Sequence, residues 1–340
     1  MKIFISIIIL LLNACSCKSG QPIKKHIVKQ NKSIALSKPK TLTDPGGKIT
    51  FIDNNTLVNS SAFAIKLWNI KTGKLLKKLN INAASIDVSP DKKYLLLGLK
   101  GKSALLNIKT GRILRYFYGL WDWVETCRFH PSGNIIASGD DKGKVILWNI
   151  KKNKRLAIYS LPNQAQSLQF SKNGELLYMS TVGKGKNVIQ CEHIKSKKKV
   201  FLKYFKGPIS SLSIIIKKDQ PLLGNTLYYR SQQFPYFHNT VHIRNANTMN
   251  TKLTFKSKHE VTNIAFHPNK DIFAIGDSDG GFKILDLKKG TILFTYHTNY
   301  NKKNEMARVQ DICFSDDGSK LAVSAMNRIL IWELQQNLIK

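Results

Sequence analysis

The sequence predicts an all-β protein, a seven-bladed β-propeller in which every blade is a four-stranded antiparallel sheet. The best-preserved unit lies at 133–150, where two apolar, β-branched runs flank a polar turn that contains glycine. The end of the second run recurs seven times, at spacings of 38 to 53 residues with a mean of 44. Repeats of about 40–45 residues with four short strands are typical of propeller blades. The residues that end these runs, called the repeat anchors below, are Asn69, Asn107, Asn149, Glu192, Asn245, Asp286 and Glu333.

Two further features recur in phase with the anchors. A turn-forming stretch precedes the second strand of most repeats, as at 130–133 (HPSG) and 171–174 (SKNG). Another turn follows the anchor, as at 71–74 (KTGK) and 109–112 (KTGR). Three features in phase along the chain indicate a true repeat.

The third repeat resembles those of the WD-repeat β-propellers. That family has a His-Pro-Ser-Gly turn, an apolar strand, a Ser-Gly-x-Asp turn and a strand that ends in Trp-Asp. Here the matching stretches are 130–133 (HPSG), 138–141 (SGDD) and Trp148-Asn149, and the resemblance covers roughly residues 30–340. The residue after the aromatic is mostly Asn or Glu, and the family's Gly-His dipeptide is absent. We therefore expect the family's Asp-His-Ser-Trp hydrogen-bond network to be incomplete in most blades.

The first residues have the pattern of an export signal. One Lys precedes the uncharged apolar run Ile3–Leu12, which at about 1.5 Å per residue is too short to cross a hydrocarbon core of about 30 Å. The stretch 12–15 (LNAC) resembles a bacterial lipobox. We therefore predict a lipoprotein signal peptide at 1–14 and lipidation of Cys15. An ordinary cleaved signal with an incidental cysteine is the alternative.

The remaining chain divides into a tether and the propeller. Residues 15–30 are polar and basic and predict a lipidated tether, whereas 31–340 hold the repeats. By resemblance to lipoprotein sorting rules, Ser16 is compatible with the outer membrane, so we expect a lipid-anchored protein of the bacterial cell envelope that faces the periplasm. The last repeat ends soon after Trp332. We predict that Ser33–Leu36 supplies the missing outer strand of the last blade, with the tail 338–340 as the competing candidate.

Aromatic residues outside the repeat pattern predict where a partner binds. Two lie in the loop expected to enter the third blade, and one lies in the loop expected to enter the seventh. Others lie in the fifth repeat, which is enlarged by about ten residues, and enlarged loops are common places for function. Packing between blades is the alternative for any one of these residues. The partner-binding candidates are Trp121, Trp123, Arg230, Tyr236, Phe237 and Tyr300.

Motifs for catalysis and metal binding are missing from the sequence. It has no Gly-x-Ser-x-Gly, no phosphate loop and no His-Glu-x-x-His. His238 and His242 would share one face of a strand but lack a third ligand at a suitable spacing. We predict no catalytic residue, no metal site, no cofactor and no enzymatic activity.

The other polar and sulfur-containing residues have structural interpretations. Carboxylates in the turns between strands are predicted to bond the nearby backbone, namely Asp140, Asp141, Asp277 and Asp279. The cysteines in apolar strands are predicted to be buried free thiols, namely Cys127, Cys191 and Cys313.

The charge balance is strongly basic, with 54 Lys and Arg against 21 Asp and Glu and a net charge of +33. Much of the basic charge falls near the expected outer strand of each blade, as at 195–199. An anionic envelope surface, lipid or lipopolysaccharide, is one partner that this rim would attract. A compositional bias that only keeps the rim soluble is the alternative. Nucleic acid is not expected, because Lys outnumbers the Arg that reads phosphates and because the chain is predicted to be exported.

Together these patterns predict a non-enzymatic, lipid-anchored envelope protein whose WD-repeat-like propeller is a scaffold for a protein partner. Two alternatives stay open. One is an adhesin that uses the basic rim on anionic surfaces. The other is a ligand-binding protein or enzyme with its site at the central channel, which would need convergent acid, base or metal groups there.

Overall fold

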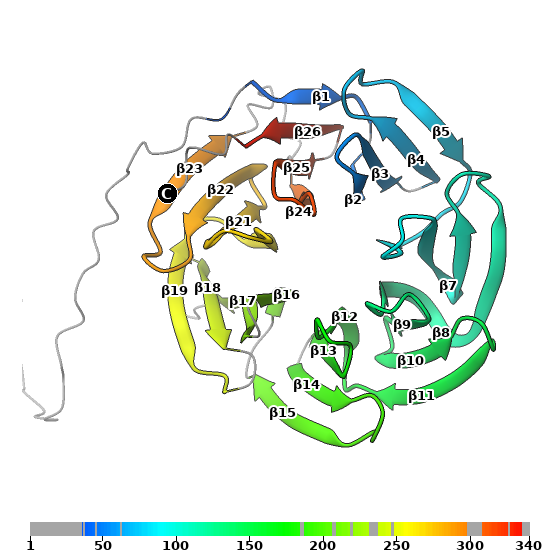
Figure 1. The fold of residues 1–340 in the computed structure, drawn as a ribbon. Helices are drawn as coiled ribbons and strands as arrows, with labels where there is room; N and C mark the ends of the chain where they lie inside the picture. Colours follow the sequence, from blue (N-terminus) through cyan, green and yellow to red (C-terminus); the bar gives the residue numbers. More distant parts are fainter. Residues whose placement is uncertain are drawn as a thin grey trace, which may run out of the picture.

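The computed structural model describes residues 36, 38–44, 46–61, 63–183, 187–205, 209–217, 220–230, 237–245, 248–297, 308–325 and 327–334. They form a closed ring of antiparallel sheets around a central channel (Figure 1). The predicted all-β propeller is confirmed. No helix among these residues is long and apolar enough to cross a membrane.

Five of the sheets have four strands each. The first repeat contributes β2 (Lys48–Asp53), β3 (Thr56–Ser61), β4 (Ala64–Asn69) and β5 (Leu75–Leu79). The fourth has β12 (Gln164–Phe170), β13 (Leu176–Val182), β14 (Asn187–His193) and β15 (Lys199–Phe205). The fifth has β16 (Ile209–Lys217), β17 (Gln220–Arg230), β18 (Phe237–Asn245) and β19 (Thr251–Ser257). The sixth has β20 (Val261–Phe266), β21 (Ile272–Asp277), β22 (Gly281–Asp286) and β23 (Ile292–His297). The last has β24 (Val309–Phe314), β25 (Lys320–Ala325), β26 (Arg328–Glu333) and β1 (Lys40–Leu42).

The second and third repeats share one six-stranded sheet, so the sheets formed by the described residues number six, one fewer than the predicted blades. Its strands are β6 (Ser85–Val88), β7 (Tyr94–Asn107), β8 (Ile113–Phe129), β9 (Ile135–Asp140), β10 (Lys144–Asn149) and β11 (Lys154–Ser160). Two of these strands are unusually long. The first part of β7 pairs with β6, and its second part pairs with β8. In the same way, β8 pairs first with β7 and then, from Val124 onwards, with β9.

The N-terminal part of the chain closes the ring, but with a different segment from the one predicted. The outer strand of the last sheet is β1, which pairs Lys40 with Ile331 and Leu42 with Ile329. In the predicted segment 33–36, only Leu36 is among the described residues; it lies outside any strand and packs on the core of the last sheet. The tail 338–340 also lies outside the described residues. Three residues suffice because the side chain of Leu42, the last of them, is buried between the first and last repeats.

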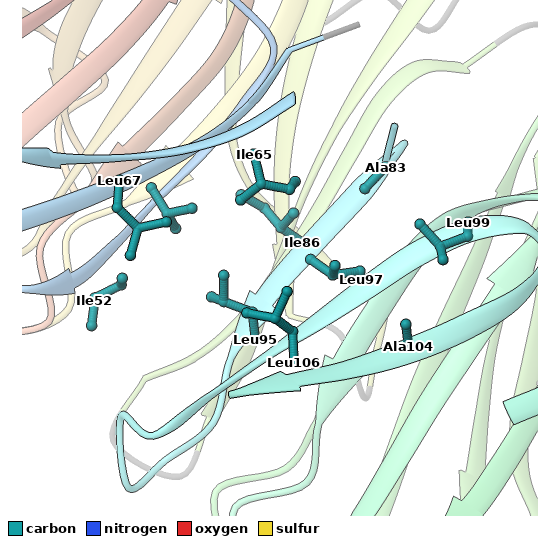
Figure 2. Packing of buried hydrophobic residues seen from close by; sticks show 11 residues of the cluster. Ile52, Ile65, Leu67, Ala83, Ile86, Leu95, Leu97, Leu99, Ala104 and Leu106 are labelled. Atoms are coloured by element: carbon teal, nitrogen blue, oxygen red, sulfur yellow. The ribbon is translucent and has the colours of Figure 1, made fainter. Parts of the chain in front are cut away.

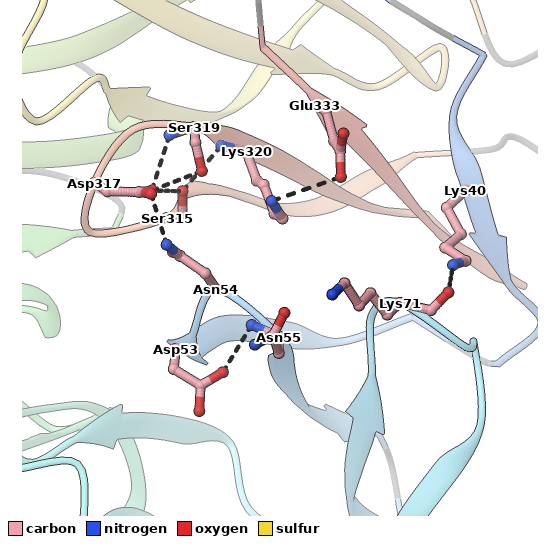
Figure 3. A network of polar contacts seen from close by, with 10 residues as sticks. All are labelled: Lys40, Asp53, Asn54, Asn55, Lys71, Ser315, Asp317, Ser319, Lys320 and Glu333. Carbon is pink, nitrogen blue, oxygen red and sulfur yellow. Dashed lines mark hydrogen bonds and ion pairs between the residues drawn. The ribbon is translucent and has the colours of Figure 1, made fainter.

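Polar contacts reinforce the closure (Figure 3). The Asp317 carboxylate accepts hydrogen bonds from Ser315 Oγ at 2.6 Å, from Ser319 N at 2.9 Å and from Asn54 Nδ2 at 2.7 Å. The Asn54 bond joins the first repeat to the last. Partial burial raises the pKa of Asp317, but these hydrogen bonds more than offset that effect and hold the pKa well below its usual value.

Five of the repeat anchors, Asn69, Asn107, Asn149, Asn245 and Asp286, cap tight turns that lead into the outer strand. Asn69 Oδ1 accepts a hydrogen bond from Thr72 N at 2.9 Å, and the Asn69 carbonyl accepts one from Gly73 N at 2.8 Å. Asn107 caps its turn in the same way, through Thr110 N at 2.9 Å. An Asn oxygen therefore accepts the bonds that the family's Asp would accept, which explains why this departure from the family pattern leaves the fold intact.

The same turn geometry corrects the anchor of the fourth repeat. The bonds made by Asn69 are made there by His193, whose carbonyl accepts from Lys197 N at 2.8 Å, and not by Glu192. The residue four positions after the anchor has a left-handed backbone conformation in each of these turns, with φ of 72° at Gly73 and 57° at Lys197. No sequence signal marks the shift, because neither His nor Lys is typical of these positions.

The apolar core lies between successive repeats. Figure 2 shows Ile65 and Leu67 of β4 packed against Leu95, Leu97 and Leu106 of β7, all of them nearly or fully buried. Full burial of one such side chain is worth roughly 1.5–3 kcal/mol. Each sheet is thus stabilised by its neighbours and the ring by its closure.

Two histidines fasten neighbouring repeats. His130 Nδ1 accepts from Ser132 N at 3.0 Å, so its Nε2 carries the proton and donates to the Gly174 carbonyl of the next repeat at 2.8 Å. His267 does the same with the Gly318 carbonyl at 3.0 Å, and its Nδ1 accepts from Lys270 N at 2.9 Å. Both belong to His-Pro turns.

The tryptophan network differs between repeats. In the first repeat Trp68 Nε1 donates to Asn59 Oδ1 at 2.8 Å, and Asn59 Nδ2 donates to Asp44 at 3.1 Å. In the third repeat the buried Trp148 Nε1 has no hydrogen-bond partner among the described residues. The network is thus rebuilt with Asn in one repeat and incomplete in another.

Candidate interaction face and central channel

The predicted residues Trp121 and Trp123 lie within strand β8, not in the loop that the sequence predicts. They sit where β8 passes from its pairing with β7 to its pairing with β9, and Trp123 pairs with Lys100. The loop prediction failed because the connection between the second and third repeats is itself extended backbone.

The Trp121 backbone is held by a buried carboxylate. Trp121 N donates to Asp140 Oδ2 at 2.8 Å, and Asp140 Oδ1 accepts from Lys142 N at 3.1 Å and from Lys144 N at 2.8 Å. Asp140 is fully buried at the end of β9. One carboxylate therefore ties β8 to the turn between β9 and β10, and the predicted backbone-bonding role of Asp140 is confirmed.

The Trp121 side chain projects from this rigid support. It is 64% exposed, and Lys144 Nζ lies 4.5 Å from the centre of its ring. Lys142 Nζ lies 3.6 Å from Asp141 Oδ2 and 4.0 Å from Asp122 Oδ2. The result is an exposed aromatic ring with a lysine over it and charges of both signs on nearby residues. Tryptophan is among the residues enriched in the energetic centres of protein interfaces. Trp123 is half-buried beside it.

The sixth repeat has the same support without the tryptophan. Asp277 Oδ1 accepts from Asp279 N at 3.1 Å and from Gly281 N at 2.8 Å, which confirms its predicted role. Lys283 lies 3.3 Å from Asp277. The carboxylate turn is thus a structural device of the repeat, and the exposed Trp121 is what distinguishes the third repeat.

The other predicted site residues are not brought together with Trp121 by the described part of the chain. Arg230 and Phe237 are paired at the ends of β17 and β18. Tyr236 and Tyr300 lie outside the described residues, as does Cys15. The enlargement of the fifth repeat is largely a longer pair of strands.

An exposed aromatic that the sequence analysis missed is Phe63, in the turn between β3 and β4. Its side chain is 80% exposed. It falls at the same place in its repeat as the Asp140 turn does in the third. A comparison of repeat positions could have found it, because a large apolar residue in that turn departs from the polar pattern.

The central channel forms a cavity of about 440 Å³, lined by the innermost strands of the repeats. Its charged lining residues are Lys48, Asp87, Glu125, Arg128, Asp311 and Asp316. Two of the carboxylates hold the ring together. Asp87 Oδ2 accepts from Phe129 N at 2.7 Å, and Asp311 Oδ2 accepts from Ile49 N at 2.9 Å, each from the neighbouring repeat.

Burial shapes the protonation of these groups. It raises the pKa of Asp87, although Arg128 at 3.6 Å opposes the shift. Burial also raises the pKa of Glu125. The charge of Lys48 opposes this shift, whereas the charges of Asp141 and Asp122 add to it. Ser85, Cys127 and Cys313 line the same cavity, and the residues described there include no histidine.

Metal binding gains no support from the described residues. They contain no group of three His, Cys, Asp or Glu placed to hold a metal ion. His242 Nδ1 lies 3.2 Å from Thr254 Oγ1, and burial together with Arg244 lowers the pKa of His242 to about 4.

The cysteines of the strands are free, as predicted. Cys127 and Cys191 are fully buried, and burial raises the pKa of each thiol to about 12. Cys313 is only partly buried, so its prediction is corrected in that respect. Buried neutral thiols act as small apolar side chains.

Comparison with known proteins supports the fold. A family model described as WD domain, G-beta repeat matches residues 111–149, and one described as anaphase-promoting complex subunit 4 WD40 domain matches 240–306. The chain is similar to a solved structure titled Structure of U3-55K, with a TM-score of 0.72 and 13% identity over 87% of this chain and 98% of that one.

Curated relatives match over shorter stretches. The guanine nucleotide-binding protein subunit beta-5b of Danio rerio is 26% identical over 135 residues, 37% of this chain and 34% of that protein. The human WD repeat and SOCS box-containing protein 1 is 29% identical over 94 residues, 26% of this chain and 22% of that protein. The chain thus spans about a third or less of the length of these relatives.

The ring of antiparallel sheets, the repeated anchor turns and the two family matches together define the class. The chain is a WD40-repeat β-propeller. Proteins of this class are typically scaffolds that bind protein partners and usually have no enzymatic activity.

Proposed function

We propose that this protein is a non-enzymatic scaffold that binds a protein partner through the surface around Trp121. The observation that carries the proposal is the exposed Trp121 ring on a backbone fixed by the buried Asp140 carboxylate. A preorganised aromatic loses little conformational entropy on binding, so its burial is converted efficiently into affinity.

The proposed scaffold has seven blades. In the six-stranded sheet, β6 and the first part of β7 form one inner pair, and the second part of β8 with β9 forms another. The two parts of the sheet meet at the Lys100–Trp123 pair, beyond the register shift between Lys100 and Lys102. Both β6 and the second part of β8 line the channel, as the innermost strand of a blade must. These features support our proposal that the shared sheet corresponds to two blades.

We also propose that Cys15 carries lipid and that the protein works in a bacterial cell envelope. The support is the lipobox-like stretch 12–15 and the basic tether that follows it. Two or more acyl chains give stable membrane attachment, whereas one gives only marginal binding. A tethered propeller would present its faces to partners at the membrane.

Crosslinking in intact cells tests the scaffold proposal. Wild type, Trp121→Ala and the control Tyr204→Ala are captured after mild crosslinking, and the attached proteins are compared. Tyr204 is 59% exposed on β15 of the fourth repeat, so the control removes a similarly exposed aromatic elsewhere on the ring. A discrete protein that is lost only with Trp121→Ala supports the proposal. An identical set with all three proteins would refute it.

A further inference from the structure

The outer strand of the second repeat, the first part of β8, carries three exposed apolar side chains in alternation. Along 113–118 exposed and covered residues alternate, and the exposed ones are Leu114, Tyr116 and Tyr118, at 54%, 36% and 57% exposure. Two of the covered ones face the third repeat: Arg115 donates to the Lys151 carbonyl at 3.2 Å, and Phe117 is fully buried 5.6 Å from the Trp148 ring. The third, Ile113, packs against the core between the first and second repeats. The exposed side chains are therefore turned away from the third repeat.

The fifth repeat carries polar residues at the corresponding positions of its outer strand. Tyr116 pairs with Ala104, and Thr254 pairs with His242. Ala104 and His242 each lie three residues before the anchor of their repeat, so Tyr116 and Thr254 occupy corresponding positions. Leu114 and Tyr118 correspond in the same way to Lys252 and Lys256, both of them exposed. The second repeat thus replaces Lys, Thr and Lys by Leu, Tyr and Tyr on the outside of the ring, where Figure 1 shows β19 and the other outer strands.

Cations accompany the apolar face. Lys102 Nζ lies 4.6 Å from the centre of the Tyr116 ring and 5.4 Å from that of Tyr118. No Asp or Glu occurs in the stretch 108–121, which contains Lys109, Arg112 and Arg115. Arg115 is turned towards the third repeat, so Lys102 is the cation in contact with the face. This charge favours an anionic partner, which must also accept exposed tyrosine and leucine side chains.

We propose that this face, formed by Leu114, Tyr116 and Tyr118 with Lys102, docks the ring on an anionic lipid bilayer. Tyrosine prefers the interfacial layer of a bilayer, where its ring is among the acyl chains and its hydroxyl is among the head groups. Lysine beside it meets the anionic head groups. A second copy of this chain is disfavoured as occupant by the net charge of +33. The proposal does not depend on the Trp121 surface.

The test exchanges the face for that of the fifth repeat. The triple variant L114K/Y116T/Y118K places at each position the residue that the chain itself carries at the corresponding position of β19. The exchange adds two positive charges and removes the apolar groups. A purely electrostatic rim would then bind anionic vesicles more tightly, by about fivefold for each added lysine, whereas insertion of the apolar face predicts weaker binding.

The full chain is mixed with vesicles of phosphatidylglycerol and phosphatidylcholine in equal amounts, and with pure phosphatidylcholine vesicles, and the sedimented fraction is measured. Binding to pure phosphatidylcholine is subtracted, which removes the contribution of the apolar N-terminal stretch. We expect at least about tenfold weaker binding of the triple variant, because the loss of apolar burial outweighs the gain from two lysines, and a smaller loss for Y118K, with Phe63→Ser unchanged. Thermal unfolding followed by circular dichroism shows whether each variant folds.

Three results would overturn the proposal. The first is a folded variant that binds anionic vesicles as well as or better than wild type. The second is wild-type protein that does not distinguish the two vesicle types. The third is evidence that another kind of partner binds this face. Soluble poly-glutamate that competes fully with the vesicles for the protein would indicate an acidic protein as the partner. A dimer that is lost in the variant would indicate a second copy of the chain.

Discussion

The contact between His267 and Gly318 makes a quantitative prediction about how neighbouring repeats are fastened. Gly318 is buried with φ of 74°, and a Cβ built on it would lie 2.2 Å from His267 Cε1. Gly318→Ala therefore has two costs. The left-handed backbone disfavours a side chain by about 1–2 kcal/mol, and the methyl group must displace an imidazole that is itself buried and hydrogen-bonded.

His267→Ala alone removes the donor to the buried Gly318 carbonyl, which costs about 1–3 kcal/mol. It also removes the ring contact with Phe314 at 5.2 Å between centres, which is worth about 0.5–1.5 kcal/mol. We therefore expect a loss of about 2–4 kcal/mol in the free energy of unfolding. In the double variant the methyl group introduced by Gly318→Ala enters the space left by the ring, so only the backbone cost is added.

The measurement is equilibrium unfolding in urea, followed by tryptophan fluorescence, for wild type, both single variants and the double variant. We expect the double variant to be more stable than the sum of the single losses by about 2 kcal/mol or more. Gly73→Ala is the matched control, because φ is 72° there and the nearest atom to a new Cβ is 3.9 Å away. It should lose only the backbone cost. Strict additivity of the His267 and Gly318 effects would refute the fastening role of the ring.

Three further predictions concern other residues. Hydrogen bonds hold the pKa of Asp317 below its usual value of 3.8, so the contribution of this carboxylate to stability is complete above that value and is lost as the pH falls towards the folded pKa. The stability difference between wild type and Asn54→Ala should therefore shrink in acid. A difference that is constant with pH would contradict this prediction. The Cys127 thiol, with its pKa raised to about 12 by burial, should react with iodoacetamide at neutral pH only after unfolding, as measured by mass spectrometry; rapid labelling of the folded protein would show that it is accessible. In cells fed a radioactive fatty acid, Cys15→Ala should abolish labelling of the protein, and labelling that persists would exclude lipidation at this position.

The repeat pattern predicted the ring because each anchor has a local physical cause. A side-chain acceptor followed four residues later by a left-handed position closes the turn, and both leave a signal in the sequence when they are Asn and Gly, as at Asn107 and Gly111. In the fourth repeat the same turn is made by His193 and Lys197. Neither residue is typical of such a turn, so the sequence-based anchor fell one residue early.

Site predictions were harder for a different reason. Trp121 was found as an aromatic outside the repeat pattern, but the hydrogen bond that holds its backbone comes from Asp140, which lies in the next hairpin. The exposed face of Leu114, Tyr116 and Tyr118 was missed because alternating apolar residues in an outer strand look the same whether a neighbour covers them or not. Only the positions of Arg115 and Phe117 show which side of the strand the third repeat covers.

Several polar groups inside the ring are occupied by structural contacts. Two channel carboxylates and the two His-Pro histidines are engaged with a neighbouring repeat: Asp87 with Phe129 N, Asp311 with Ile49 N, and His130 and His267 with backbone carbonyls. A catalytic group must change its protonation or its bonds during turnover. A change in any of these groups would weaken the contacts between repeats. The exposed aromatic side chains carry no such structural duty, so they can bind a partner while the ring stays intact.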